Sequence, residues 1–561
     1  MQPPAAAAFV LVPLLALPPT PSARALQDPP GLAFTRAERC ALCHSEAPGA
    51  TAMRDGSGTS VAPYELWRPT MMGSSARDPL WRAVLSAEVA ALPQLREAIE
   101  SKCLRCHAPV LAATPEGTLG ARASLEELAT DGQLSSIARE GVTCLVCHQV
   151  LSDVLGGMES FSGGARLSPE RRAFGPHASP LAHPMRMHSG FTPAEGPHVL
   201  RAGLCGTCHT LFTPVRNATG EELGRLFPEQ APYLEWRSSA YSDEGTGPGP
   251  LAATCQDCHL PKTGADGRRL RTRIARNPRG GDFPPIRERE PFGRHVLAGG
   301  NTLVPALLAA QAEDAAGGVP AAAYLAKADA AQEVLAQAAS LRVHDVEPSQ
   351  GRLRFAVEVL NLTGHKLPTG HPTRRAWLRV RVLDAAGAVL FESGGHDERG
   401  RLLGSDGRPA PQELAAGPQW PHTPRVSAPG EVQVYEAVMA DAAGTATFRL
   451  LAGATWFKDD RVLPAGFAPG ATDAPHVLPR GVEGDDDFAA GCDRVLFDLA
   501  LDVRRGPLSI EAELLYQPLG ARWLAELAAV DTPQVRQLLE LLERVPPATE
   551  RVARVVWREE G

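Results

Sequence analysis

The stretch Cys40-Ala-Leu-Cys43-His44 is the first of five copies of one pattern, and this pattern decides how the first half of the chain folds. The other copies are Cys103-Leu-Arg-Cys106-His107, Cys144-Leu-Val-Cys147-His148, Cys205-Gly-Thr-Cys208-His209 and Cys255-Gln-Asp-Cys258-His259. Cys-x-x-Cys-His is the attachment sequence of c-type haem. The two thiols reach the two vinyl groups of one porphyrin, and the histidine supplies the proximal nitrogen of the iron. The spacing therefore predicts five covalently attached haem c groups.

Other uses of cysteine explain the pattern less well. Two Cys-x-x-Cys pairs can form a zinc ribbon, but five pairs leave one over and zinc gives no reason for the histidines. A thioredoxin-like redox pair does not need five copies, and structural disulfides rarely repeat at one short spacing. The eleventh cysteine, Cys492, has no such neighbours, and we interpret it as a packing residue.

Composition excludes several classes of protein. The 561 residues are 44% hydrophobic and 21% charged, which excludes collagen-like and wholly disordered chains. The formal net charge is -8, so a nucleic-acid partner is not expected. The length requires at least two separate cores.

The first 25 residues resemble an export signal. Residues 5–17 are almost wholly apolar, and Ala23-Arg24-Ala25 matches a cleavage site, although no Lys or Arg precedes the apolar run. The run is shorter than the ~20 residues of a membrane span. We expect a signal peptide over 1–25 and a mature chain without a membrane span in the bacterial periplasm, or otherwise outside the cytoplasm. The alternative is a disordered or buried N-terminus.

The remaining chain divides into two dissimilar parts. Residues 26–300 contain all five motifs and few periodic apolar stretches, which predicts a loop-rich, mainly α haem domain with a weak core and helices at 81–104 and 123–140. Residues 301–340 are expected to form a helical connector, with a helix over 320–341. From 341 to 561 apolar residues alternate, which predicts a mainly β, sandwich-like domain. Its strands are expected at 353–359, 378–382, 431–439, 445–451, 495–503 and 508–516, and a helix at 532–545 is expected to close the chain.

Second ligands for the irons must come from later in the chain. Of the 16 histidines, 11 lie outside the motifs, and none of these precedes His177. The first candidates are His188, His295 and His365, followed by His183, His198, His177 and His371. His365 lies in Gly364-His365-Lys-Leu-Pro368-Thr369-Gly370 between two predicted strands, so we expect the β domain to supply at least one ligand; alternatively, His365 only braces its loop.

Other potential ligands have simpler explanations. Met71 and Met72 can ligate a haem iron, but packing is the commoner role of methionine. We interpret the remaining histidines as structural; these are His344, His396, His422 and His476.

These motifs resemble multihaem cytochromes of the cytochrome c-552/4 kind. The resemblance also rests on five further stretches, which are Tyr233-Leu-Glu235-Trp236-Arg-Ser238, His295 to Asn301, Gly364 to Gly370, Trp456 to Pro464 and Leu515-Tyr516-Gln517. It implies close-packed haems with two histidine ligands each and a role in electron transfer. Tetrahaem members are common, so the fifth motif leaves the haem arrangement open.

Three functions are compatible with the sequence. The first is an electron carrier that works with redox partner proteins. The second is a multihaem oxidoreductase that acts on a small nitrogen or sulfur compound at one open haem, which leaves open whether the chain is an enzyme. No motif carries lysine in place of its histidine, and spare histidines are plentiful, so we favour the carrier. The third is a docking protein that uses its β domain, which is compatible with the first.

Overall fold

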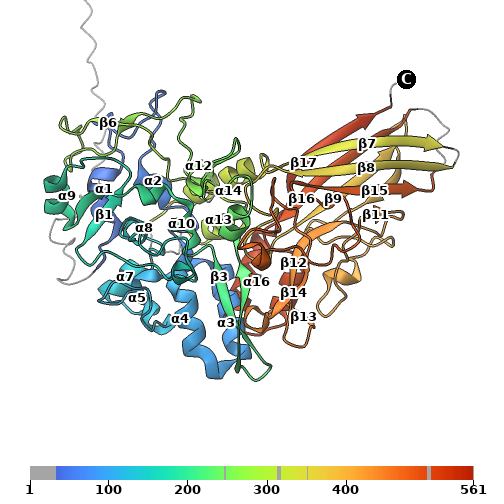
Figure 1. Ribbon diagram of the computed structural model, residues 1–561, viewed down its shortest axis with the longest axis horizontal. Coiled ribbons are helices and arrows are strands. Elements are labelled where there is room, and N and C mark those ends of the chain that lie inside the picture. Colours follow the sequence, from blue (N-terminus) through green and yellow to red (C-terminus); the bar gives the residue numbers. More distant parts are fainter. Residues whose placement is uncertain (1–32, 245–247, 313–317, 350, 502–506, 560–561) are drawn as a thin grey trace, which may run out of the picture.

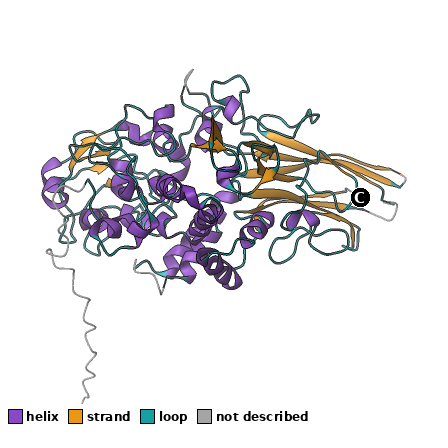
Figure 2. Cartoon of the chain, turned by 90° about the horizontal axis from the view of Figure 1, so that it is seen from below, coloured by secondary structure: helices purple, strands orange, loops and turns teal. Residues whose placement is uncertain are grey.

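The computed structural model describes residues 33–244, 248–312, 318–349, 351–501 and 507–559. Helices and loops gather at one end of the molecule and long strands at the other (Figures 1 and 2). The mixed architecture expected from the sequence is therefore present, while the domain boundaries at 300 and 340 stay predictions. The expected signal peptide, 1–25, lies outside the described residues.

The helical half is built from short elements. Its helices are α1 (Ala37–His44), α2 (Pro63–Trp67), α3 (Pro79–Ala91), α4 (Arg96–His107), α5 (Pro109–Ala112), α6 (Leu125–Ala129), α7 (Gln133–Ala138), α8 (Cys144–His148), α9 (Ala182–Ser189), α10 (Ala202–Gly206), α11 (Pro232–Arg237) and α12 (Cys255–His259). Three two-stranded sheets accompany them, made of β1 (Arg172–Gly175) with β2 (Thr192–Glu195), β3 (Leu211–Arg216) with β4 (Glu222–Gln230), and β5 (Thr272–Arg273) with β6 (Glu288–Arg289).

Two predicted helices of this half are each split in two. The helix expected at 81–104 is interrupted between α3 and α4, because Pro93 follows Leu92 and disfavours a helical conformation there. The helix expected at 123–140 becomes α6 and α7. Side chains including Leu85, Ile99 and Leu104 nevertheless form a buried cluster, so this half has more of an apolar core than its sequence predicts.

The β half forms two sheets. The seven-stranded sheet contains β9 (Arg375–Leu383), β10 (Val389–Ser393), β12 (Val434–Ala440), β13 (Ala446–Thr447), β14 (Thr455–Asp459), β16 (Ser509–Gln517) and β17 (Glu550–Arg558). The four-stranded sheet contains β7 (Ala339–Ser349), β8 (Arg352–Asn361), β11 (Arg425–Val426) and β15 (Cys492–Leu499).

One apolar core joins the two sheets. Leu353, Phe355, Val357 and Val359 of β8 alternate with more exposed residues and are fully buried, as period-two patterning requires. Phe497 of β15 stacks on Phe355 at a ring-centroid distance of 4.9 Å. The same core cluster includes side chains of β9 and β16 from the other sheet, so the two sheets of this half share one core.

Helices join the two halves. Between them lie α13 (Leu303–Ala310) and α14 (Ala321–Leu335), and α15 (Ala521–Ala528) and α16 (Pro533–Arg544) come late in the chain (Figure 1). The predicted helix 320–341 ends at Leu335, because β7 begins at Ala339. Leu80 of α3, Leu307 of α13 and Leu538 of α16 share one buried cluster. Among the described residues, no helix has the length and apolar character that a membrane crossing requires.

The end of the chain differs from the prediction. Thr532 caps α16 by accepting a hydrogen bond from the amide of Val535 at 3.2 Å, as expected. A closing helix is nevertheless wrong, because β17 follows and pairs with β16. The strand expected at 445–451 is reduced to β13, because Leu450–Ala452 forms a 3₁₀ turn whose amides bond Glu88 of α3.

Candidate functional site

The five motifs have similar local structures. Helices α1, α4, α8 and α12 all end at the motif histidine, and the fourth motif begins in α10. In a helix, residues three and four apart lie on one face, so both cysteines and the histidine point to the same side. No disulfide joins the 11 cysteines, all of which lie within the described residues. The geometry therefore suits the attachment of one group per motif.

Backbone carbonyls orient four of the motif imidazoles. In each, Nδ1 donates a hydrogen bond to a carbonyl oxygen and so leaves the lone pair on Nε2 for a metal, the arrangement typical of ligating histidines. The pairs are His44 with Ile274 (2.9 Å), His107 with Ser75 (3.3 Å), His148 with Phe174 (2.6 Å) and His259 with Ala298 (2.7 Å).

Burial keeps motif imidazoles neutral. It lowers the pKa of His107 and of His209 to about 4, and it lowers the pKa of His44 and His148. The ring of Trp81 stacks on His107 with centroids 4.4 Å apart, a contact that no sequence pattern indicated. A neutral imidazole is the form that binds iron, so the donor set fits haem.

His295 lies opposite the third motif. Its ring centroid is 6.2 Å from that of His148, and the two rings are inclined by 27°. Its Nδ1 bonds the Gly293 carbonyl oxygen at 3.1 Å, and burial lowers its pKa to about 4. Because a metal–imidazole bond is about 2.0 Å long, two rings on opposite sides of one metal have centroids roughly 6 Å apart. This pair fits one iron between the two rings.

The β half places two buried histidines near the motifs. Burial lowers the pKa of His365, and the charges of His259 and Arg374 act on it in the same direction. Burial also lowers the pKa of His371 to about 3, with contributions from Arg374 and His107. The segment between β8 and β9 therefore brings His365 near the fifth motif and His371 near the second.

The remaining candidates lie in less favourable places. His188 is half-buried on α9, and its carbonyl accepts a hydrogen bond from Arg39 of α1 at 3.5 Å, which places α9 beside the first motif. His183 is exposed on the same helix. His177 is half-buried, with Arg289 nearby. Nε2 of His198 donates to the carbonyl oxygen of Val150 at 2.8 Å, so this nitrogen is already engaged.

The motifs also contact one another. Thiols of different motifs lie close enough to shift one another's pKa, and the pairs are Cys40 with Cys144, Cys106 with Cys208 and Cys205 with Cys255. Cys147 of the third motif acts electrostatically on Cys205 and Cys208 of the fourth. The order in space is therefore first, third and fourth, with the second and fifth both beside the fourth.

A buried ion network holds the His365 loop against the helical half. Glu235 of α11 accepts hydrogen bonds from the Lys366 amide (3.1 Å) and the Thr369 hydroxyl (2.5 Å). It also pairs with Arg461 at 3.0 Å. Asp459 binds Lys366 Nζ (2.6 Å) and Arg461 (two contacts of 2.7 Å). Three stretches that carry the resemblance, around residues 235, 366 and 460, thus meet in one network that sequence reasoning did not foresee.

Gly364 allows this loop to approach α11 closely. A Cβ atom at this position would lie 3.1 Å from the ring of Trp236 and 3.2 Å from Cβ of Tyr241. The Ser239 hydroxyl donates to the Gly364 carbonyl oxygen at 3.2 Å. The loop is therefore attached to the helical half on both sides of His365.

Comparisons with known proteins bear on the fold alone. No protein-family model matches the chain, and no curated protein matches its sequence. The structure is similar to the crystal structure of a penta-haem cytochrome c552 from Thermochromatium tepidum, with a TM-score of 0.50 and 16% sequence identity. The match covers 94% of this chain and 100% of that one. It supports a multihaem cytochrome fold, which the motifs predict, and the haem content of this chain belongs to the proposal below.

Proposed function

We propose that the chain is an exported pentahaem c-type cytochrome that transfers electrons between redox partner proteins outside the bacterial cytoplasm. Haem c, when bound, accepts and releases one electron at its iron. The observation that carries the proposal is the spatial continuity of the five motifs, which the thiol contacts between them indicate. Electron transfer between haems needs such closely spaced, rigidly held sites.

The proposal assigns the chain's residues to three tasks. The ten motif cysteines form the thioether links, and the motif histidines are the proximal ligands. His295 is the second ligand opposite His148, and His365 is a second ligand supplied by the β half. His188 is proposed for the first motif because α9 lies beside α1. His183 is a weaker candidate because its side chain is exposed. His198 is a weaker candidate because its Nε2 already donates a hydrogen bond.

The number of haems per chain tests the proposal. The full chain is matured in a host that attaches haem c, and haem is measured by pyridine haemochrome against protein concentration and by intact mass. We expect five haems, and a Cys205→Ala, Cys208→Ala variant should contain four. N-terminal sequencing should give Leu26 as the first residue. Fewer than five haems in the parent protein contradicts the proposal.

An EPR spectrum of the oxidised protein separates the two functional alternatives. Five low-spin signals are expected for an electron carrier whose irons all have two protein ligands. A stoichiometric high-spin signal that changes when nitrite, hydroxylamine or sulfite is added favours an oxidoreductase with one open iron instead.

A further inference from the structure

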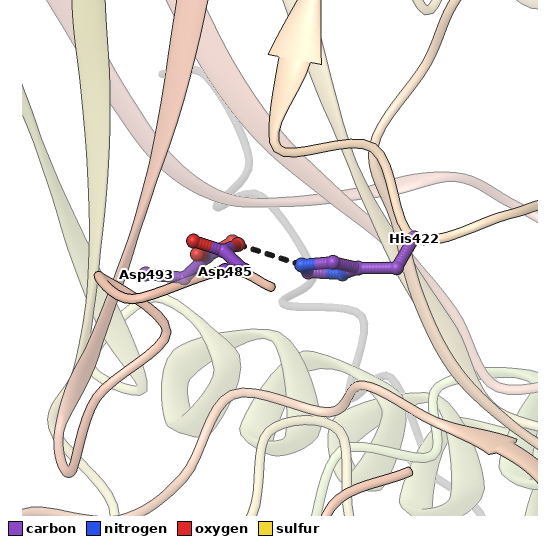
Figure 3. Close-up of side chains that lie close together, drawn as sticks. All are labelled: His422, Asp485 and Asp493. Carbon is purple, nitrogen blue, oxygen red and sulfur yellow. Dashed lines mark hydrogen bonds and ion pairs between the residues drawn. The ribbon is translucent and has the colours of Figure 1, made fainter. Parts of the chain in front are cut away.

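A second polar cluster lies in the β half, outside the haem motifs. His422 precedes β11, Asp485 lies in the loop before β15, and Asp493 is on β15. One ligand atom from each of the three lies within 4.8 Å of the others. Both carboxylates face the imidazole of His422 (Figure 3). The sequence alone assigned His422 only a structural role.

Asp460 orients the imidazole from its other side. Nδ1 of His422 lies 3.1 Å from Asp460, and Nε2 lies 2.7 Å from Asp485. Asp460 is fully buried, accepts the Glu436 amide at 3.0 Å and pairs with Lys458 at 3.3 Å. A carboxylate on the far nitrogen is what fixes the tautomer and direction of metal-binding histidines.

Hydrogen bonding within the cluster leaves one oxygen atom of Asp493 without a partner. Its side chain is fully buried, and Oδ2 accepts the Tyr435 hydroxyl at 2.6 Å. Oδ1 has no hydrogen-bond partner among the described residues. Leaving a buried charged acceptor unpaired costs more than the 1–3 kcal/mol of a neutral group.

The charges of the cluster favour a cation. The carboxylates of Asp460, Asp485 and Asp493 lie around one lysine, Lys458, and the imidazole of His422, so negative charges outnumber positive ones whether or not the imidazole is protonated. Protonation satisfies Asp460 and Asp485 but leaves Oδ1 of Asp493 without a partner. A dication beside Nε2 replaces the proton there and gives both Asp485 and Asp493 a counterion.

We propose that His422, Asp485 and Asp493 bind a divalent transition metal ion, of which Zn²⁺ and Mn²⁺ are the test cases. One imidazole and two carboxylates are a donor set of this class, whereas Ca²⁺ and Mg²⁺ prefer oxygen ligands alone. The ligands belong to β15 of one sheet and to two loops, while Tyr435 reaches the site from β12 of the other sheet and Asp460 from the residue directly after β14. The ion therefore joins the two sheets at this point.

Metal content of the haem-loaded protein tests the proposal. The protein is dialysed against a chelator and titrated with ZnCl₂, MnCl₂ or CaCl₂, and metal is measured by mass spectrometry and calorimetry. We expect one Zn²⁺ or Mn²⁺ per chain beyond the haem iron, together with a higher midpoint of thermal unfolding. Absence of Zn²⁺ and Mn²⁺ binding, or preference for Ca²⁺, overturns the proposal.

Matched variants locate the ion. Asp485→Asn lies in a loop and should weaken binding at least tenfold while the fold persists. Asp486→Asn removes the same charge from the neighbouring exposed residue and should bind as the parent does. Cys492→Ser removes the one cysteine outside the motifs and should also bind normally. Equal losses in Asp485→Asn and Asp486→Asn, or loss of the ion in Cys492→Ser, contradict the assignment. His422→Gln gives an independent loss of binding if Asp485→Asn does not fold.

Discussion

Glu235→Gln tests whether the buried ion network holds the His365 loop in place. Glu235 is fully buried and makes contacts of 3.1, 2.5 and 3.0 Å with Lys366, Thr369 and Arg461. Two carboxylates balance two cations here, and glutamine keeps the shape while it removes one negative charge. Breaking a buried pair costs about 3–5 kcal/mol. Because Arg461 keeps both contacts with Asp459, we expect the lower end, about 3 kcal/mol.

Urea unfolding followed by far-UV circular dichroism measures this loss. Glu543→Gln is a matched control, because Glu543 pairs with Arg399 at the surface, where both side chains are more than half exposed. An exposed pair contributes about 0–1 kcal/mol, so the control should stay close to the parent. If Glu235→Gln lowers the free energy of unfolding no more than Glu543→Gln does, the network does not hold the loop.

Further predictions concern the ligands and pH. His295→Ala should convert one haem in five to high spin in EPR, and His198→Ala should leave the spectrum unchanged; equal spectra for both variants refute the pairing with His148. His365→Ala should likewise convert one haem and shift one potential, and an unchanged spectrum excludes it as a ligand. Burial raises the pKa of Glu88 from 4.5 to about 7. Between pH 4.5 and 7, Glu88 is therefore protonated in the folded protein and ionised in the unfolded chain. The free energy of unfolding should accordingly fall by up to about 3 kcal/mol as pH rises from 4.5 to 7. Glu88→Gln should flatten this part of the thermal unfolding profile, and an unchanged slope contradicts the assignment.

Features set by neighbouring residues could be predicted from the sequence. The helical spacing of cysteines and histidine within each motif follows from three- and four-residue contacts. The alternation from Leu353 to Val359 indicates one buried face and one more exposed face. Thr532 and Pro533 mark the start of α16 because a hydroxyl cap and a first-turn proline suit a helix N-terminus.

Features set by distant contacts could not be predicted. The strand β17 exists because β16 offers it a free edge, and the turn at Leu450 exists because Glu88 binds its amides. The opposition of His148 and His295 joins residues 147 positions apart, and local periodicity carries no information on such a pair. The contact between Glu235 and Arg461 could not be predicted either, because charged residues are usually exposed and these two are buried.

Residues 458–461, at the end of β14 and directly after it, link the two polar clusters of the β half. Successive side chains of an extended chain point in opposite directions. Lys458 and Asp460 accordingly face the His422 cluster, while Asp459 and Arg461 face the network around Glu235. A cation that fixes Asp460 through His422 also restrains the adjacent Asp459, and through it the Lys366 side chain next to His365. The β half therefore does more than cover the helical half. It contacts the His365 loop through Lys366, and under the proposed function this contact gives electron transfer the fixed geometry that it needs.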